Sequence, residues 1–285
     1  MRFKGNKIQP LDAQTTQENT LVPRHPFTLQ ITAGKAGGKT TCILNLLINP
    51  NVYHKHFHRV IWISPTINLD EKIQRLFDYD VVGKNEPLLN LIIQEKLKNK
   101  NLSKSQIAAL FHMFNEPTEP EFYEDPGNIL GEVIEDQKKI IRKYGKKYAD
   151  RVCIILDDLA GDRHFYNSPA MVKKIFNSRH VYISVIMTSQ SYKSIPYKIR
   201  ENNTSLFLFD TSDMARLKEI YAENTEKLTF NEFYALFMNI MNEDHAFLNF
   251  TCQNTMGHNL IRNIEEFIDY WPRKEAPRQL GQDHA

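Results

Sequence analysis

The chain has 285 residues, a formal net charge of +2, 41% hydrophobic residues and 25% charged residues. This composition is ordinary for a globular protein and excludes a strongly basic chain, so any contact with nucleic acid must depend on local patches. No apolar run approaches the roughly 20 residues that span a bilayer, and three separated cysteines, Cys42, Cys153 and Cys252, argue against a disulfide framework and for a reducing compartment.

The most informative segment is a glycine-rich turn between an apolar alternating run at 27–31 and an apolar helical run at 42–48. This order of strand, turn and helix predicts a phosphate-binding P-loop, G-x-x-x-x-G-K-[ST], with Ala33 where the first glycine usually stands. Small residues let backbone N–H groups wrap a phosphate at the positive end of the following helix. The residues expected to bind nucleotide are Ala33, Gly34, Lys35, Ala36, Gly37, Gly38, Lys39, Thr40 and Thr41.

Within this loop the chemistry divides between two side chains. Lys39 is expected to reach the β- and γ-phosphates, and the hydroxyl of Thr40 is expected to hold Mg²⁺. The sequence therefore predicts ATP and Mg²⁺ as ligands. Ala33 is tolerable there unless the backbone requires a positive φ, which would strain it.

The next segments favour an alternating α/β chain, with a strand at 59–65 and a helix at 70–78. Before this strand, His54, His56 and His58 alternate, which would place them on one face of a strand and suggests metal binding. No cysteine or carboxylate completes a metal-ligand spacing, so a solvated loop is the preferred interpretation.

Residues 83–149 are polar and helix-rich, and we interpret them as an insertion before the next strand. The run at 138–148 is strongly basic with interleaved tyrosines. Such a run suits contact with a nucleic acid backbone and equally suits a solvated helix face.

An unbroken apolar run at 152–156 ends in Asp157 and Asp158, which is typical of a strand buried in a parallel sheet. Because such strands point their carboxyl ends at the ligand crevice, Asp157 is expected beside the P-loop as a Mg²⁺ ligand. Asp158 would point differently and polarise the attacking water. Without the P-loop, a buried strand followed by an acidic turn would be the simpler interpretation.

A further apolar run at 181–189 ends at Gln190, whose amide is placed to hydrogen-bond the γ-phosphate or the attacking water. An ordinary loop glutamine is the alternative.

Later segments predict a strand at 204–209, helices at 213–222 and 228–241, and a strand at 246–251. The series predicts an α/β fold of the P-loop NTPase (RecA/ASCE-like) class, with a central, mostly parallel sheet flanked by helices. We assign an N-terminal arm at 1–23, the domain at 24–271 and a polar tail at 272–285.

The order of P-loop, Asp-Asp strand and Gln190 strand, followed by the Ile-Arg-x-Asn segment at 199–202, resembles the FtsK–HerA superfamily of P-loop ATPases. The nearest likeness is the poxvirus-type genome-packaging ATPases of large DNA viruses and virophages. It covers roughly residues 24–255. The resemblance implies that the strand carrying Gln190 lies between the strands of the P-loop and of Asp157.

By this resemblance Lys39 and Thr40 are Walker A residues, Asp157 and Asp158 are Walker B residues, and Gln190 is the sensor. Relatives often carry glutamate where Asp158 stands. Arg200 is the first candidate for an arginine finger that acts on a neighbouring subunit, and Arg179 is the second.

The resemblance implies ATP hydrolysis coupled to translocation of double-stranded DNA into a preformed viral capsid. The implied partners are DNA, further copies of the chain in a homo-oligomeric ring (a pentamer or hexamer), and capsid or portal-vertex proteins. The implied location is the host cytoplasm at a virus factory, or the virion. A DNA helicase, a non-motor nucleotide-binding assembly factor and a small-molecule kinase stay open as alternatives.

Overall fold

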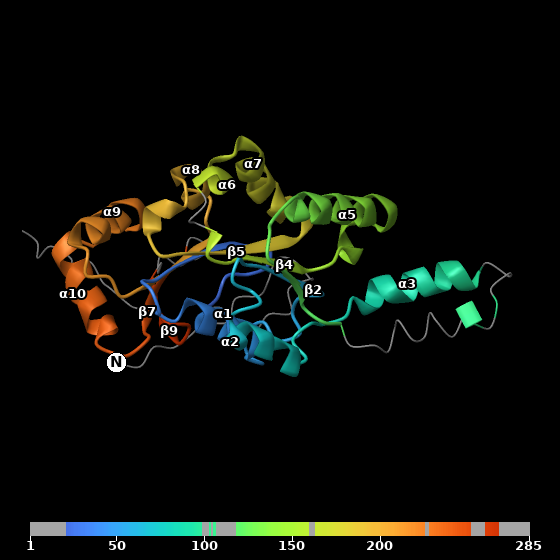
Figure 1. Cartoon of the computed structure of the whole chain (residues 1–285), viewed down its shortest axis with the longest axis horizontal. Helices are drawn as coiled ribbons and strands as arrows, with labels where there is room; N and C mark the ends of the chain where they lie inside the picture. The colour runs from blue at the N-terminus through green and yellow to red at the C-terminus, as the bar shows by residue number, and fades with distance from the viewer. Residues whose placement is uncertain are drawn as a thin grey trace, which may run out of the picture.

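The computed structural model describes residues 21–98, 103, 105–106, 118–159, 163–225, 228–251 and 260–267. These residues form a nine-stranded sheet in the order β3-β2-β4-β5-β1-β6-β7-β8-β9. Figure 1 shows this sheet between two layers of helices. The predicted α/β fold is therefore confirmed.

Six of the described strands run parallel to one another and make up the larger part of the sheet. They are β1 (Thr28–Thr32), β2 (Arg59–Ile63), β3 (Glu121–Tyr123), β4 (Val152–Leu156), β5 (Ile183–Ser189) and β6 (Ser205–Phe209). β1, β4, β5 and β6 are buried along their whole length, which explains their unbroken apolar character. β5 lies between β4 and β1, as the resemblance implied.

Three antiparallel strands continue the sheet beyond β6: β7 (Phe247–Thr251), β8 (Leu260–Arg262) and β9 (Glu266–Phe267). Because β7 runs against β6, it begins at the edge where the parallel strands end. β8 runs back, so the turn between β8 and β9 returns to that same edge. This geometry brings two C-terminal segments next to the P-loop.

The helices divide between the faces of the sheet (Figure 1). One face carries α1 (Lys39–Ile48), α2 (Glu71–Gln74) and the 3₁₀ turn η1 (Arg75–Asp78), whose apolar residues pack with those of β1, β2 and β4. The opposite face is covered by α5 (Ile129–Tyr144), α6 (Arg163–Asn167), α7 (Pro169–Ser178), α8 (Tyr197–Arg200), α9 (Met214–Asn224) and α10 (Phe230–Met241).

Four short or peripheral elements complete the described part of the chain. They are α3 (Glu86–Leu97), η2 (Lys146–Tyr148), η4 (Arg179–Val181) and η5 (Tyr192–Ser194). None of the helices in the described ranges is long and apolar enough to cross a bilayer.

Two expectations about segment boundaries need adjustment. The segment at 83–149 contains the predicted helices, but it also contributes β3 to the edge of the sheet. The packed domain begins before residue 24, because Val22 is buried and the carbonyl of Leu21 accepts a hydrogen bond from Asn249. Residues 1–20 and the tail at 272–285 lie outside the described residues, as does Cys252.

The solvated loop expected for the alternating histidines is wrong for two of them. His56 and His58 are 7% and 8% exposed, and the ring of His56 packs against His25 with centroids 5.7 Å apart. The segment forms turns directly before β2 rather than a strand. The alternation of a strand, which would place the three rings on one face, therefore does not apply. Among the described residues, no group of three or more His, Cys, Asp or Glu is placed to hold a metal ion.

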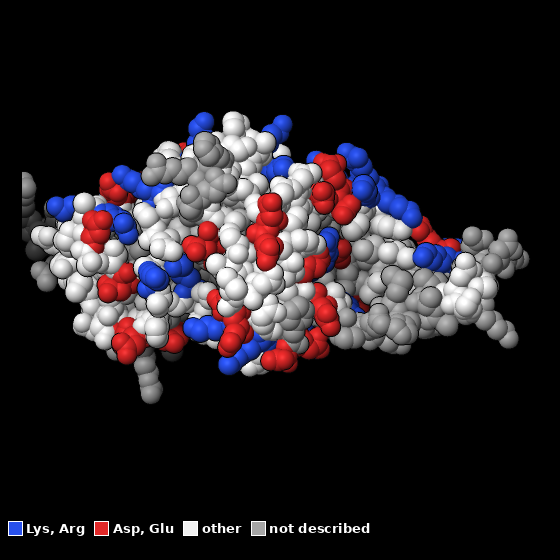
Figure 2. All heavy atoms as spheres, viewed as in Figure 1, with Lys and Arg blue, Asp and Glu red and all other residues white. Residues whose placement is uncertain are grey.

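The basic run at 138–148 forms the end of α5, Gly145 and the whole of η2. Figure 2 shows positive side chains gathered at this end of the molecule, with acidic ones among them. Lys138, Lys139 and Lys143 pair with Glu135, Asp136 and Glu95 respectively. These pairs neutralise much of the local charge, which favours a solvated helix face over a nucleic acid contact.

Candidate nucleotide-binding site

The P-loop connects the end of β1 to the first residue of α1. Gly38 caps α1 with a φ of 91°, a backbone conformation that side chains rarely adopt. At Gly37 a Cβ atom would lie 2.9 Å from the Cβ of Ala33 and 3.1 Å from the carbonyl oxygen of Gly34. Both glycines are therefore required by the shape of the loop, which leaves the N-terminal amides of α1 open to an anion.

Ala33 takes the place of the usual first glycine without strain. It is absent from the described residues that have a positive φ, and its side chain is 2% exposed. The condition under which alanine would be unfavourable therefore does not arise. Its methyl group instead occupies the space into which a side chain at position 37 would project, so position 37 requires glycine.

The ammonium group of Lys39 lies inside the loop. It donates to the carbonyl oxygens of Ala33 and Gly34, both at 3.1 Å. Burial lowers the pKa of Lys39, and the nearby carboxylates of Asp158 and Asp157 oppose this shift. The lysine is thus close enough to the paired carboxylates for the two halves of the predicted site to form one site.

Asp157 is held from two sides. Thr188 on β5 donates to Oδ1 at 2.6 Å, and the indole N–H of Trp62 on β2 donates to Oδ2 at 3.3 Å. The residue is 6% exposed, and burial raises the pKa of its carboxyl group despite these two hydrogen bonds. The neighbouring strands therefore fix the orientation of the carboxylate.

Asp158 turns away from Asp157 because its backbone is left-handed, with a φ of 54°. Its amide donates to the hydroxyl of Thr188 at 2.9 Å, and its Oδ1 accepts from the amide of Gln190 at 3.4 Å. A non-glycine residue in this conformation stores strain of the kind often found at functional sites. The arrangement brings the two groups predicted to position a water molecule face to face.

Thr40 and Asp157 fit a Mg²⁺ ion by their chemistry. A hydroxyl and a carboxylate are hard oxygen ligands, and Mg²⁺ usually takes one or two such protein ligands and completes its shell with phosphate oxygens and water. Thr40 lies in the first turn of α1 beside the phosphate cradle. Bound there, the ion would offset the charge of the phosphates.

Sequence reasoning missed the two residues that hold Asp157. Trp62 lies within the strand predicted at 59–65 and Thr188 within the apolar run at 181–189, and neither belongs to a recognised motif. The parallel register that pairs Ile63 with Leu156 and Leu156 with Met187 brings all three strand ends together. Only the order of the strands reveals the contacts between Trp62, Asp157 and Thr188, because these residues are far apart in the chain.

Arg200 is occupied within its own chain. Its guanidinium donates to both carboxylate oxygens of Glu223, at 3.1 and 2.7 Å, and to the carbonyl of Ile195 at 2.6 Å. It also lies 4.6 Å above the ring of Tyr192, and its side chain is 7% exposed. These contacts join α8 to α9 and engage Nε and both Nη atoms of the guanidinium within the chain.

Arg179 has a different environment. It lies in η4, before the amino end of β5 and thus at the edge of the sheet opposite the P-loop. Its guanidinium makes no hydrogen bond or ion pair with any residue that the structure describes. Within one chain it is remote from Lys39, so any role in hydrolysis requires a second copy.

The fold and the site together define a nucleotide-binding protein of the P-loop NTPase class, with the Gln190 strand between the strands of the P-loop and of Asp157. Residues 128–247 match the family model described as Poxvirus A32 protein. The match covers less than half of the chain and includes Asp157, Asp158, Gln190 and Arg200, but not the P-loop. It confirms the resemblance to the poxvirus-type ATPases that the motif order indicated.

Solved structures offer weaker likenesses. The DNA-packaging ATPase B204 from Sulfolobus turreted icosahedral virus is 15% identical, with 80% of this chain and 93% of that chain covered and a TM-score of 0.49. The genome-packaging NTPase B204 of Sulfolobus turreted icosahedral virus 2, in complex with ATP-gammaS, gives 13% identity, 79% and 92% coverage and a TM-score of 0.47. These scores are too low to support an inference about function. No curated protein matches the chain in sequence.

Proposed function

We infer that the chain is an ATP-driven translocase of double-stranded DNA that packages a viral genome. The main support is that four residues lie together at the edge of the sheet where the parallel strands end: Lys39, Asp157, Asp158 and Gln190. The resemblance over residues 128–247 supplies the packaging role. Both supports are needed, because a P-loop alone is compatible with many reactions.

The residues of the site divide the work of hydrolysis between them. Lys39 and the amides of the loop stabilise the charge on the β- and γ-phosphates, and Thr40 and Asp157 hold Mg²⁺. Asp158 and Gln190 face each other at 3.4 Å and orient the water that attacks the γ-phosphate in line. A hydrogen bond from the Gln190 amide to the γ-phosphate or the attacking water would also let this residue sense whether the γ-phosphate is present.

A second subunit completes the active site in this proposal. An arginine supplied in trans accelerates hydrolysis roughly 10³–10⁵-fold in characterised P-loop enzymes. The intramolecular contacts of Arg200 favour Arg179 for this role. The proposed partners are therefore DNA, further copies of the chain in a pentameric or hexameric ring, and capsid or portal-vertex proteins, in the host cytoplasm or at the virion.

ATP turnover with and without DNA tests the proposal. We expect duplex DNA to stimulate hydrolysis more strongly than single-stranded DNA of equal length. Lys39→Ala is the control, because its side chain contacts only the loop, so the variant should fold and lose turnover. A folded Lys39→Ala protein with normal turnover contradicts the nucleotide site. Turnover that no DNA stimulates contradicts a motor and favours a switch or a kinase.

A further inference from the structure

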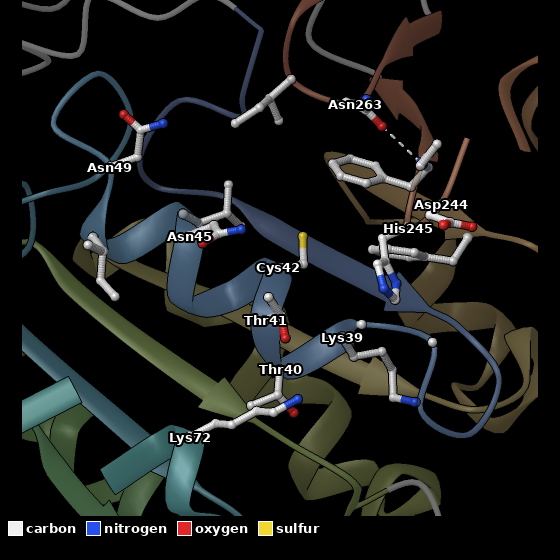
Figure 3. A pocket seen from close by; sticks show the side chains of 18 of the residues that line it. Lys39, Thr40, Thr41, Cys42, Asn45, Asn49, Lys72, Asp244, His245 and Asn263 are labelled. Carbon is white, nitrogen blue, oxygen red and sulfur yellow. Dashed lines mark hydrogen bonds between the residues drawn. The ribbon is translucent and has the colours of Figure 1, made fainter. Parts of the chain in front are cut away.

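A pocket of about 850 Å³ opens beside the P-loop, within the range that ligand sites of this kind occupy. Most of its lining comes from three segments: residues in 36–50 of the loop and α1, residues 243–247 before and in β7, and residues 263–265 between β8 and β9. Asp70 and Lys72 at α2 and Phe209 at the end of β6 complete it. Figure 3 shows Cys42 and Asn45 on the side of α1 that faces the pocket, with His245 and Asn263 across from them.

The position of the pocket relative to the P-loop indicates which part of a bound nucleotide would reach it. β1 lies between β5 and β6, and the groups that act on the γ-phosphate follow β5 and β4. The pocket lies on the other side of the P-loop, beside Phe209 at the end of β6 and the start of β7. A linear triphosphate whose γ-phosphate points to Asp158 must leave the loop on this second side.

Lys39 and Lys72 line the pocket near the P-loop, whereas the part formed by β6, β7 and the turn between β8 and β9 suits a nucleoside better than a phosphate. Phe247 and Phe209 both line the pocket, with ring centroids 5.0 Å apart, and the exposed 8% of Phe247 offers an apolar edge to a base. Asp244 and Glu265 line the rim, and their carboxylates make no hydrogen bond or ion pair with the described residues. Carboxylates accept hydrogen bonds from ribose hydroxyls or base amino groups and repel phosphate, so they fix the direction of binding.

His245 occupies the junction between the loop and the pocket. A Cβ atom built on Gly38 would lie 3.4 Å from its Nδ1 atom, so the ring lies against the cap of α1. The residue holds a left-handed backbone with a φ of 61°, which directs it toward the loop from the turn before β7. The ring thus lies between the P-loop and the rest of the pocket.

We propose that this pocket binds the nucleoside half of the nucleotide, with the base over Phe247, the ribose at the carboxylates and His245 beside the α-phosphate. The proposal rests on the nucleotide binding proposed above. It adds a specific site, to which the segments before β7 and between β8 and β9 contribute residues that lie outside the sequence motifs.

Calorimetric binding of ATP and of inorganic triphosphate, each with Mg²⁺, tests the pocket separately from the P-loop. Asn45 is exposed on α1 and lines the pocket, so Asn45→Trp fills the space without changing the core. We expect this variant to bind ATP at least about tenfold more weakly and to bind triphosphate within about twofold of the original protein. Met238→Trp, on the exposed side of α10, is the matched control and should change neither affinity.

His245→Asn provides a second variant, because asparagine tolerates a left-handed backbone. It should weaken ATP binding and have a smaller effect on triphosphate. Unchanged ATP affinity in Asn45→Trp, or a parallel loss of both ligands, would overturn the nucleoside pocket while leaving the P-loop assignment intact. If the original protein binds neither ligand, the proposed nucleotide function fails as well.

Discussion

At the scale of single residues, the geometry of the site depends most on how Asp157 is held. Its carboxylate is buried and receives hydrogen bonds from two neighbouring strands. Thr188 serves both halves of the pair, because its hydroxyl donates to Asp157 and accepts from the amide of Asp158. A single hydroxyl therefore sets the angle between the metal ligand and the water-positioning group.

Replacing Thr188 tests this role. Thr188→Val keeps the shape but removes the hydroxyl, so Asp157 loses a donor and the amide of Asp158 loses its acceptor. Loss of such a supporting partner typically costs about 10–100-fold in metal affinity or activity. We expect a Mg²⁺ titration of ATP turnover to shift to higher concentration, and Thr188→Ser to restore it. A valine variant with the original Mg²⁺ dependence would contradict the positioning role.

The two carboxylates should separate by function. Asp157→Asn should weaken Mg²⁺-dependent nucleotide binding, because it removes the charged metal ligand. Asp158→Asn should retain binding and slow hydrolysis, since Asp158 faces Gln190 rather than the predicted Mg²⁺ ligand. Binding and single-turnover assays distinguish the steps. Equal loss of binding in both variants would show that the division of roles is wrong.

At the scale of elements, the pair formed by Arg200 and Glu223 connects α8 to α9. Arg200→Ala and Glu223→Gln should therefore lower thermal stability, and the double variant should be less destabilised than the sum of the two. The coupling expected for two residues in direct contact is about 0.5–3 kcal/mol. Additive effects would contradict a structural role for Arg200.

Mixing experiments then identify the arginine that acts in trans. Arg179→Ala mixed with Lys39→Ala should recover activity, because an intact loop in one subunit meets an intact Arg179 in the next. The same mixture made with Arg200→Ala should recover little, since its defect lies within its own subunit. If only the mixture of Arg200→Ala with Lys39→Ala recovers activity, Arg200 and not Arg179 is the arginine that acts in trans.

The elements around the P-loop were predictable from sequence because local pattern determines them. Apolar runs and glycine spacing indicated β1, α1, β4 and β5, and the carboxyl ends of parallel strands placed Asp157 near the loop. β3, β8 and β9 were missed because strands of two or three residues carry too little periodicity to detect. The contacts of Trp62 and Arg200 depend on tertiary packing, which no local pattern contains.

At the scale of the whole molecule, three buried histidines make stability depend on pH. Burial lowers the pKa of His25 and His58, and lowers that of His56 to about 3. The unfolded chain, in which a histidine has a pKa near 6.5, therefore binds more protons than the folded chain below that pH. The free energy of unfolding should therefore have its full value above about pH 6.5. It should fall as the pH decreases below that value, by up to about 1.4 kcal/mol per pH unit for each histidine.

Chemical denaturation between pH 7.5 and about 5 measures this dependence. His56→Gln should reduce the slope of stability against pH, and His180→Gln should leave it unchanged because that residue is exposed on η4. The contradicting result is a stability that is independent of pH in this range. Such a result would mean that the buried rings retain their protons in the folded state.

The central claim is that ATP hydrolysis moves the protein along double-stranded DNA. Displacement of a third strand from a DNA triplex measures this most directly, because a translocase removes the third strand while the duplex stays paired. We predict ATP-dependent release of the third strand, no release with Lys39→Ala, and an intact duplex throughout. Separation of the duplex strands would indicate a helicase, and ATP turnover without release of the third strand would contradict translocation altogether.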